Sequence, residues 1–296
     1  MKTECLRAAG IWVDSDRVSS LKEFGIILYS GEITGMLGLV GSGITVVADA
    51  LSGRKKLEKG QIYMDHTPVQ IRGMAQAEKM GIYVISEKTI FLDDLRLEEN
   101  LCLSQRQESM GITFPSEKQI SRIRRCMEEL KIQLKLKEYP KKLGSLECHL
   151  AEILRAYLMG CRILILNHIA NRYTRKELEK LKDVLDLLKE KGIAILLLES
   201  SCERVCKGTD SLYVLRGGRV EGIFERKEYD PGKIKRVMLG DYEIPDTQKT
   251  QFFYENDKTL LLEARGLEST AFKELCFQVE KGEVIGFWEE ENGICQ

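Results

Sequence analysis

Residues 35–45 form the sequence feature that most restricts how this chain folds. They read Gly-Met-Leu-Gly-Leu-Val-Gly-Ser-Gly-Ile-Thr and follow the phosphate-binding pattern G-x-x-x-x-G-K-[ST] at every fixed position except the lysine. The glycines of such a loop let backbone N–H groups surround phosphate oxygens at the start of a helix. The pattern therefore predicts a buried strand, the loop and a helix, in that order.

Two kinds of group bind phosphate in such a loop: the backbone N–H groups and the side chain of the lysine. Ile44 occupies the position of the lysine, which would bring positive charge to the β- and γ-phosphates. Thr45 occupies the position of the hydroxyl that contacts magnesium. The sequence thus predicts a phosphate-shaped backbone without its cation. The candidate phosphate-binding residues are Gly38, Gly41, Ser42, Gly43, Ile44 and Thr45.

Composition restricts the class of partner. The 296 residues carry a formal net charge of -1, so we expect no nucleic-acid partner. No apolar run approaches the length of about 18 residues that a spanning helix needs, and we expect no direct membrane insertion. The nine cysteines and three histidines are dispersed, so buried reduced thiols are a simpler interpretation than a metal site built from them.

Apolar runs alternate with amphipathic helical patterns along most of the chain. Nearly continuous β-branched or leucine runs favour parallel strands covered on both faces, and hence a layered α/β fold. Between about residues 88 and 150 the pattern becomes mainly helical, which predicts a helical subdomain. The predicted strands include 6–13, 21–28, 33–37, 61–64, 81–86, 161–166, 193–198 and 211–215, and helices are predicted at 45–51 and 175–191.

An internal repeat sets the domain organisation. Gly31-Glu-Ile-Thr-Gly resembles Gly282-Glu-Val-Ile-Gly, at a spacing of 251 residues, and Ala9-Gly-Ile resembles Arg265-Gly-Leu at nearly the same spacing. We predict a first domain at 1–241, a polar linker at 242–258 and the start of a second copy at 259–296.

The ordered motifs resemble those of the ATP-binding subunit of an ABC importer, of the tandem two-cassette type that drives uptake of ribose, galactose and similar sugars. The resemblance covers nearly the whole chain, and the best-matching stretches are 31–53, 81–101 and 161–181, followed by 205–222. It implies a P-loop cassette with a helical subdomain, followed by the start of a second cassette. It also implies ATP and Mg²⁺ as ligands.

Several positions depart from the family pattern that this resemblance implies. The Walker B strand of the family ends in Asp-Glu, whereas 163–166 are followed here by Asn167 and His168. Asn167 removes a carboxylate from the magnesium site, and His168 replaces the base that polarises water. The glutamine-loop position falls on Glu87, which is a weak candidate to supply the missing metal carboxylate.

The remaining family positions are also changed. The signature aligns with Gly144, Ser145, Leu146 and Glu147, so its essential glycine has become Leu146. The switch histidine falls on Ser200. The aromatic residue that stacks on adenine falls near Ser15, although Trp12 is close. Each substituted side chain also has a plain structural interpretation, in which Ile44 and Leu146 pack, Asn167 caps its strand, His168 is a hydrogen-bonded histidine and Glu87 is solvated.

Three hypotheses follow from these substitutions. In the first, the chain is a cassette of a sugar importer that has lost hydrolysis and docks on membrane permease subunits or on another cassette, as a homo- or heterodimer. The second keeps it an active ATPase, but only in a composite site shared with a partner chain. The third makes it a regulatory or sensor module outside transport. The resemblance implies a cytoplasmic location, peripheral at the inner face of the cell membrane when assembled with a permease.

Overall fold

The computed structural model describes residues 2–14, 20–103, 116–169, 173–201, 208–240, 259–268 and 274–286. The chain divides into two compact units, Met1–Gly240 and Asp241–Gln296. The predicted linker at 242–258 lies outside the described residues.

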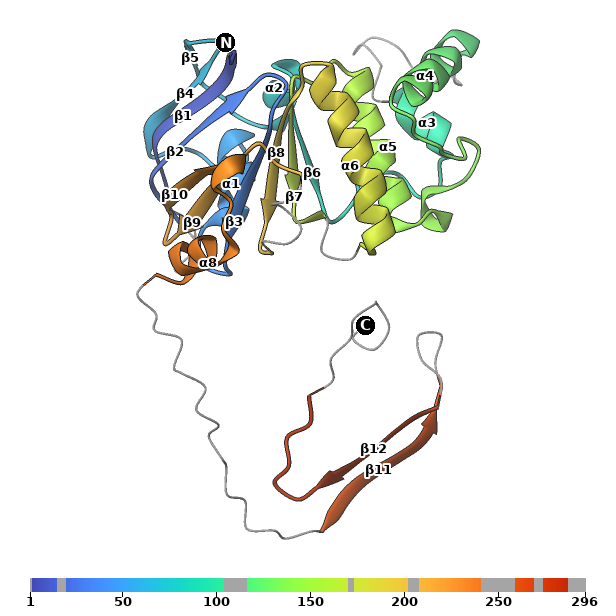
Figure 1. Cartoon of the computed structure of the whole chain (residues 1–296). Helices are drawn as coiled ribbons and strands as arrows, with labels where there is room; N and C mark the ends of the chain where they lie inside the picture. The colour runs from blue at the N-terminus through green and yellow to red at the C-terminus, as the bar shows by residue number, and fades with distance from the viewer. Residues whose placement is uncertain are drawn as a thin grey trace. The chain divides into compact units, whose positions relative to one another are not determined.

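The larger sheet of the first unit has six strands in the order β10-β9-β3-β8-β7-β6. The strands from β9 to β6 pair in parallel, and β10 pairs antiparallel with β9. The parallel α/β core that the apolar runs predicted is confirmed (Figure 1). The strands are β3 (Ile33–Gly38), β6 (Ile82–Ser86), β7 (Ile163–Asn167), β8 (Ala194–Glu199), β9 (Ser211–Arg216) and β10 (Arg219–Glu225).

A second, antiparallel sheet has the order β2-β1-β4-β5. Its inward side chains, such as Leu6, Phe24 and Ile62, are buried and form one apolar cluster with α1 and the near face of the parallel sheet. The alternation of burial along β2 is the pattern expected of a strand with one covered face. The strands are β1 (Glu4–Val13), β2 (Leu21–Tyr29), β4 (Lys59–Met64) and β5 (Thr67–Val69).

Helices cover the other face of the parallel sheet. α5 and α6 pack on it with α3 and α4 beyond them, and together they enclose a second apolar cluster (Figure 1). No helix within the described ranges has the length and apolar character needed to cross a membrane. The helices are α1 (Ile44–Leu51), α2 (Met74–Lys79), α3 (Leu97–Leu103), α4 (Glu117–Glu129), α5 (Ser145–Leu158), α6 (Arg175–Glu190) and α8 (Pro231–Leu239), with 3₁₀ turns η1 (Pro140–Lys142) and η3 (Arg226–Glu228).

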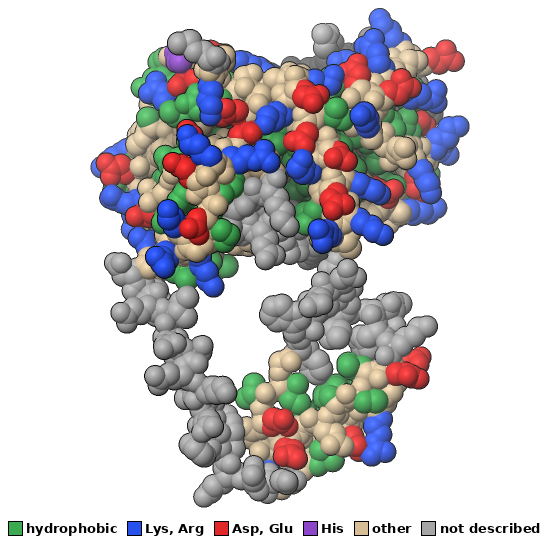
Figure 2. All heavy atoms as spheres, in the orientation of Figure 1, with side chains coloured by type: hydrophobic (Ala, Val, Ile, Leu, Met, Phe, Trp, Pro, Cys, Tyr) green, Lys and Arg blue, Asp and Glu red, His purple; other side chains and the backbone are tan. Residues whose placement is uncertain are grey.

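The surface of the first unit mixes both signs of charge. Lysine and arginine side chains alternate with aspartate and glutamate over the face shown in Figure 2. Because opposite charges lie next to one another, many of them form exposed ion pairs, such as Lys182 with Asp186 at 2.5 Å.

The second unit contains one described hairpin, formed by β11 (Leu260–Leu267) and β12 (Leu275–Glu280). Its pairing reproduces that of β1 with β2. Two of the three register shifts of β1 lie between Glu4 and Leu6 and between Ala8 and Ile11, and the two of β11 lie at the same positions 256 residues later. Gly10 and Gly266 share a left-handed φ of 60° and 57°. The second strands match at a spacing of 251, so the connection between the strands is five residues shorter in the second hairpin.

Candidate functional site

The carboxyl ends of four parallel strands meet at one edge of the sheet. The register pairs Leu37 with Glu199, Asn167 with Leu198, and Ser86 with Asn167. The residues that follow these ends include the glycine loop, His168, Ser200 and Glu87. Because ligands of open α/β sheets bind outside the carboxyl ends of the strands, this edge is the candidate site.

The glycine loop is held in shape by its backbone. Gly41 and Gly43 adopt left-handed φ values of 85° and 94°, and the carbonyl oxygen of Ser42 accepts a hydrogen bond from the N–H of Gly218 at 2.8 Å. A Cβ at Gly43 would lie 2.5 Å from the carbonyl oxygen of Ser20, and one at Gly38 would lie 2.3 Å from the Ser42 hydroxyl. Glycine is therefore required at Gly43, and a side chain at Gly38 would displace the Ser42 hydroxyl.

The loop leaves donors for an anion at the start of α1. The N–H groups of Gly41 and Gly43 donate to no other described residue. Thr45 is exposed in the first turn of α1, whereas Ile44 is only 3% exposed and belongs to the apolar cluster between the two sheets. The predicted order of strand, loop and helix is present, and the residue at the lysine position packs into the protein.

Asn167 ends β7 with a buried oxygen. Its Oδ1 atom accepts no hydrogen bond from the described part of the chain. A buried acceptor without a donor costs about 1–3 kcal/mol. The amide therefore presents an unsatisfied oxygen at the position where the family places a metal-binding aspartate.

His168 lies beside a carboxylate that the sequence had not singled out. Its Nδ1 atom is 4.0 Å from Oε2 of Glu199, and the Glu199 side chain is 5% exposed. Burial lowers the pKa of His168, and the nearby charge of Glu87 opposes that shift. His168 is thus mainly neutral near pH 7. Its backbone has a left-handed φ of 54°, a conformation in which histidine is enriched relative to most residues.

The loop that follows β6 is fixed by α5. The Nε2–H of His149 is shared between the carbonyl oxygens of Ser86 and Glu87, at 3.1 and 3.3 Å, and its Nδ1 atom contacts the hydroxyl of Tyr173. Because carbonyl oxygens only accept, Nε2 carries the proton and Nδ1 accepts from Tyr173. Burial lowers the pKa of His149, which favours this neutral form. The Glu87 side chain itself is exposed.

A buried carboxyl group holds the same loop further along. Oε1 of Glu152 on α5 accepts the N–H of Ile90 at 2.7 Å. Burial raises the pKa of Glu152 to about 7, against the opposing effects of this hydrogen bond and of the Arg155 charge. The position of the loop therefore depends on a group that titrates near neutral pH.

The predicted signature residues lie at the start of α5. Gly144 precedes the helix, and its N–H donates to Oε2 of Glu147 at 2.9 Å. Ser145 is exposed, whereas Leu146 is 5% exposed and packs in the apolar cluster beneath the helices. A leucine side chain here points into the core, and the exposed part of this turn is Gly144 with Ser145.

The remaining predicted residues are placed less completely. Ser200 is exposed directly after β8. Trp12 lies on β1, where the ammonium of Lys59 is 5.4 Å from the centre of its ring. Ser15 lies outside the described residues.

Sequence reasoning missed Glu199, His149 and Glu152. Glu199 carried a usable signal, because a carboxylate ended an otherwise apolar strand beside the switch position. His149 and Glu152 carried a weaker one, as polar residues on a helix whose neighbours are apolar. Their contacts reach about 60 positions along the chain, which a single sequence does not reveal.

The fold and this edge together define an α/β protein of the glycine-loop class, with the loop between a central strand and a helix. Residues 21–170 match the family described as ABC transporter, and this is more than half of the chain. The chain belongs to the ABC transporter family.

Curated relatives match over nearly the whole chain. The ribose import ATP-binding protein RbsA of Clostridium perfringens (strain 13) is 28% identical over 289 residues, which is 96% of this chain and 57% of the relative. The protein of the same name from Jannaschia sp. is 26% identical over 287 residues, 96% of this chain and 54% of the relative. The chain thus spans about half the length of these relatives.

Solved structures share the fold. The ADP conformation of an ATP-binding cassette of an ABC transporter has a TM-score of 0.69 and 20% identity, covering 80% of this chain and 96% of that one. A dimeric bacterial ABC transporter cassette has a TM-score of 0.62 and 15% identity, covering 76% of this chain and all of that one.

Proposed function

We propose that residues 1–241 form a nucleotide-binding cassette that binds ATP through its glycine loop but does not sustain efficient hydrolysis. One observation carries this proposal. The loop retains the backbone shape of a phosphate cradle, while the strand ends around it present Ile44, Asn167 and His168 in place of a lysine and two carboxylates.

The residues fit the phosphates of a nucleotide better than they fit a metal ion. The loop offers N–H groups and a helix N-terminus to anionic oxygens. For Mg²⁺, which is usually held by one or two carboxylates together with substrate phosphates, the corresponding positions supply the Thr45 hydroxyl and the unsatisfied Oδ1 of Asn167. No group of three or more His, Cys, Asp or Glu side chains gathers as a metal site in the described part of the chain.

Loss of charge explains the loss of turnover. A preorganised electrostatic donor contributes about 10²–10³ in rate, and a general base contributes about 10²–10⁴. Ile44 supplies no cation where charge develops on the phosphates. His168, with its lowered pKa, is a neutral base beside the Glu199 carboxylate, and the metal carboxylate that would position the nucleotide is replaced by Asn167.

A calorimetric titration with Mg-ATP tests binding. We expect Thr45→Ala to weaken Mg-ATP binding and Ile44→Lys to strengthen it by about tenfold, because a charge-assisted contact to a phosphate contributes about 1.5–3 kcal/mol. Ile223→Lys is the matched control, since Ile223 is 60% exposed on β10, and a lysine there adds the same charge outside the glycine loop. Equal affinities for the two lysine variants would contradict an open cradle.

A composite active site is the second candidate. The observation that favours it is the position of His168 beside the buried carboxyl group of Glu199, with Nδ1 4.0 Å from Oε2, which keeps a base and a second titratable group at the site edge. In this version phosphate release appears only when a competent cassette supplies the missing groups across an interface. Release by the mixture that is abolished by Glu199→Gln in this chain would support it, and release unchanged by that substitution would count against it.

The relatives support a place in a sugar importer. These relatives are ribose import ATP-binding proteins. We propose that this chain docks on permease subunits of such an importer or on a second cassette, at the inner face of the cell membrane. Co-purification with the permease tests this. A protein that binds nucleotide but associates with no permease would instead be a regulatory or sensor module.

The hairpin of the second unit supports the start of a second cassette at 259–296. Its bulges and its left-handed glycine match those of β1 and β2. The positions buried in the first hairpin are also apolar in the second: Leu6, Ile11, Phe24 and Ile26 correspond to Leu262, Leu267, Leu275 and Phe277. Leu262 is 52% exposed and Leu267 44%, and Figure 2 shows apolar side chains on this hairpin.

A further inference from the structure

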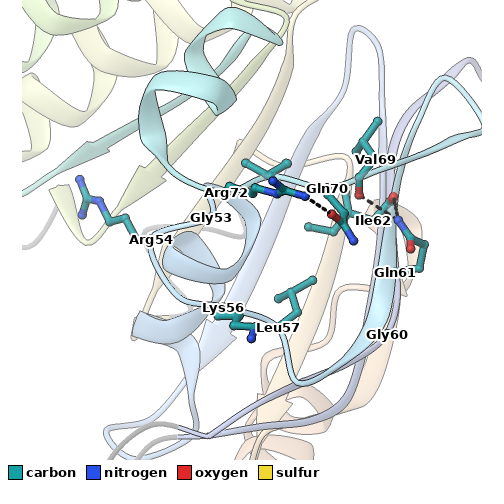
Figure 3. Close-up of a pocket in the computed structure, with 11 residues that line it drawn as sticks. Gly53, Arg54, Lys56, Leu57, Gly60, Gln61, Ile62, Val69, Gln70 and Arg72 are labelled. Carbon is teal, nitrogen blue, oxygen red and sulfur yellow. Dashed lines mark hydrogen bonds between the residues drawn. The ribbon is translucent and has the colours of Figure 1, made fainter.

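A cleft of about 530 Å³ lies beside the end of α1 that is distant from the glycine loop. It is bounded by the turn from Gly53 to Leu57 and by the β4–β5 hairpin with the segment that follows it (Figure 3). The eight residues of α1 separate it from the loop by roughly 12 Å, at 1.5 Å per residue. Its volume is within the usual range for small-molecule sites.

The charge of the cleft is positive. Arg54, Lys56 and Arg72 line it, and no aspartate or glutamate is among the lining residues. This is a local excess in a chain with a formal net charge of -1. Arg54 is partly compensated, because its Nη1 atom is 3.6 Å from Oδ1 of Asp49 and its side chain points away from the cleft. The charges available to a ligand are therefore those of Lys56 and Arg72.

These two cations lie on facing sides. Figure 3 shows Arg72 with Gln70 on one side and Lys56 with Leu57 on the other. Nη2 of Arg72 donates to the neutral amide oxygen of Gln70 at 3.1 Å, which orients the guanidinium without neutralising it. Lys56 makes no ion pair with any described residue. Among the residues that the structure describes, no acidic side chain pairs with either charge.

The walls of the cleft are apolar and fixed. Leu57, Val69 and Ile71 line it and pack against the apolar cluster between the two sheets. A Cβ at Gly53 would lie 2.6 Å from the carbonyl oxygen of Ile71, so the two segments that form the cleft are in backbone contact. The amide nitrogen of Gln61 bonds the carbonyl oxygens of Ile62 and Val69 at 2.8 Å each, which stabilises the hairpin side.

We propose that this cleft is a second binding site, for a small organic anion whose phosphate or carboxylate contacts Arg72 and Lys56 and whose apolar body lies against Leu57, Val69 and Ile71. A guanidinium matches either anion with paired hydrogen bonds. The apolar walls favour an organic anion over inorganic phosphate, because burying the body of the ligand adds hydrophobic free energy. The proposal does not depend on nucleotide binding at the loop.

Calorimetry at low ionic strength with phenyl phosphate and inorganic phosphate tests the site. We expect phenyl phosphate to bind more tightly than inorganic phosphate. The double substitution Lys56→Gln with Arg72→Gln should weaken phenyl phosphate binding by about tenfold or more, since each lost charged hydrogen bond contributes about 1.5–3 kcal/mol. The matched control is Lys176→Gln with Arg226→Gln, two exposed cations outside the cleft, which should leave the affinity unchanged.

Two further variants keep the test decisive. Arg72→Lys preserves the charge but not the paired hydrogen bonds, and should weaken binding less than the double substitution does. Thr45→Ala, in the loop, should leave phenyl phosphate binding intact. Three results would each overturn the proposal. The wild-type chain could fail to bind phenyl phosphate, the Lys56→Gln, Arg72→Gln variant could bind it as tightly as the wild type, or Thr45→Ala could be the variant that loses binding.

Discussion

The glycine loop and the segment that follows β6 lie at the same edge of the sheet, but they are held in place by different means. The loop depends on backbone contacts, such as that between Ser42 and Gly218. The segment after β6 depends on buried titratable side chains of α5, namely His149 and Glu152. A cradle built from backbone does not need the lysine for its shape, so it can persist after the charged residues change.

The largest effect should come from restoring the signature glycine on α5. Leu146 is buried in the core beneath the helices, so Leu146→Gly should lower the free energy of unfolding by about 4 kcal/mol through the cavity and the glycine penalty. The neighbouring Ser145 is exposed, and Ser145→Gly should cost less than about 1 kcal/mol. Urea denaturation measures both. Similar losses would show that Leu146 is not a packing residue.

Glycine substitutions in the loop should have the next largest effect. Gly43→Ala combines a left-handed φ with a Cβ that would lie 2.5 Å from the Ser20 carbonyl oxygen, and should cost about 3 kcal/mol. Gly217 also has a positive φ, of 56°, but a Cβ there meets nothing within 4 Å, so Gly217→Ala should cost about 1 kcal/mol. Thermal or urea unfolding separates strain from close contact. Equal costs would mean that the loop is not held by the backbone contact.

A smaller effect, a pH dependence of the free energy of unfolding, should distinguish the segment after β6 from the glycine loop. The pKa of Glu152 rises from its ordinary 4.5 to about 7 in the folded chain. The folded chain therefore binds more protons between these values, and the free energy of unfolding falls as pH rises from about 4.5 to about 7. The loss is complete above that range.

Glu152→Gln removes this titration while keeping an acceptor for the Ile90 N–H. The variant should be about 2 kcal/mol more stable than the wild type near pH 8, with a smaller difference near pH 5. Glu190→Gln, at an exposed position on α6, is the matched control. Amide exchange at Ile90 should follow the same pH dependence, while exchange at Ser42 in the loop should not. If amide exchange at Ile90 and at Ser42 depended on pH in the same way, the segment after β6 and the glycine loop would not be held by different means.

Much of the fold could be predicted from local pattern. The strand 33–37, the loop and the helix 45–51 lie within one residue of the observed bounds, because apolar runs and a glycine motif act over short distances. The antiparallel sheet was not predicted, since β1 pairs with β4 across about 50 positions and β5 has only three residues.

The site was predicted in part for the same reason. Positions inside a motif, such as Asn167 and His168, could be named from spacing. Glu199 carried a signal as a carboxylate at the end of an apolar strand, but its burial and its position beside His168 depend on the register of β8 against its neighbours. The interaction of α5 with the segment after β6 depends on how a helix packs on the sheet, which no local pattern encodes.

The central claim is that the glycine loop still binds nucleotide, while the missing charged residues prevent hydrolysis. Its most direct test is to measure phosphate release by the purified chain. The wild type should bind Mg-ATP, and its release rate should equal that of Thr45→Ala, at background. Sustained, magnesium-dependent release by the wild type that Thr45→Ala abolishes would contradict the account.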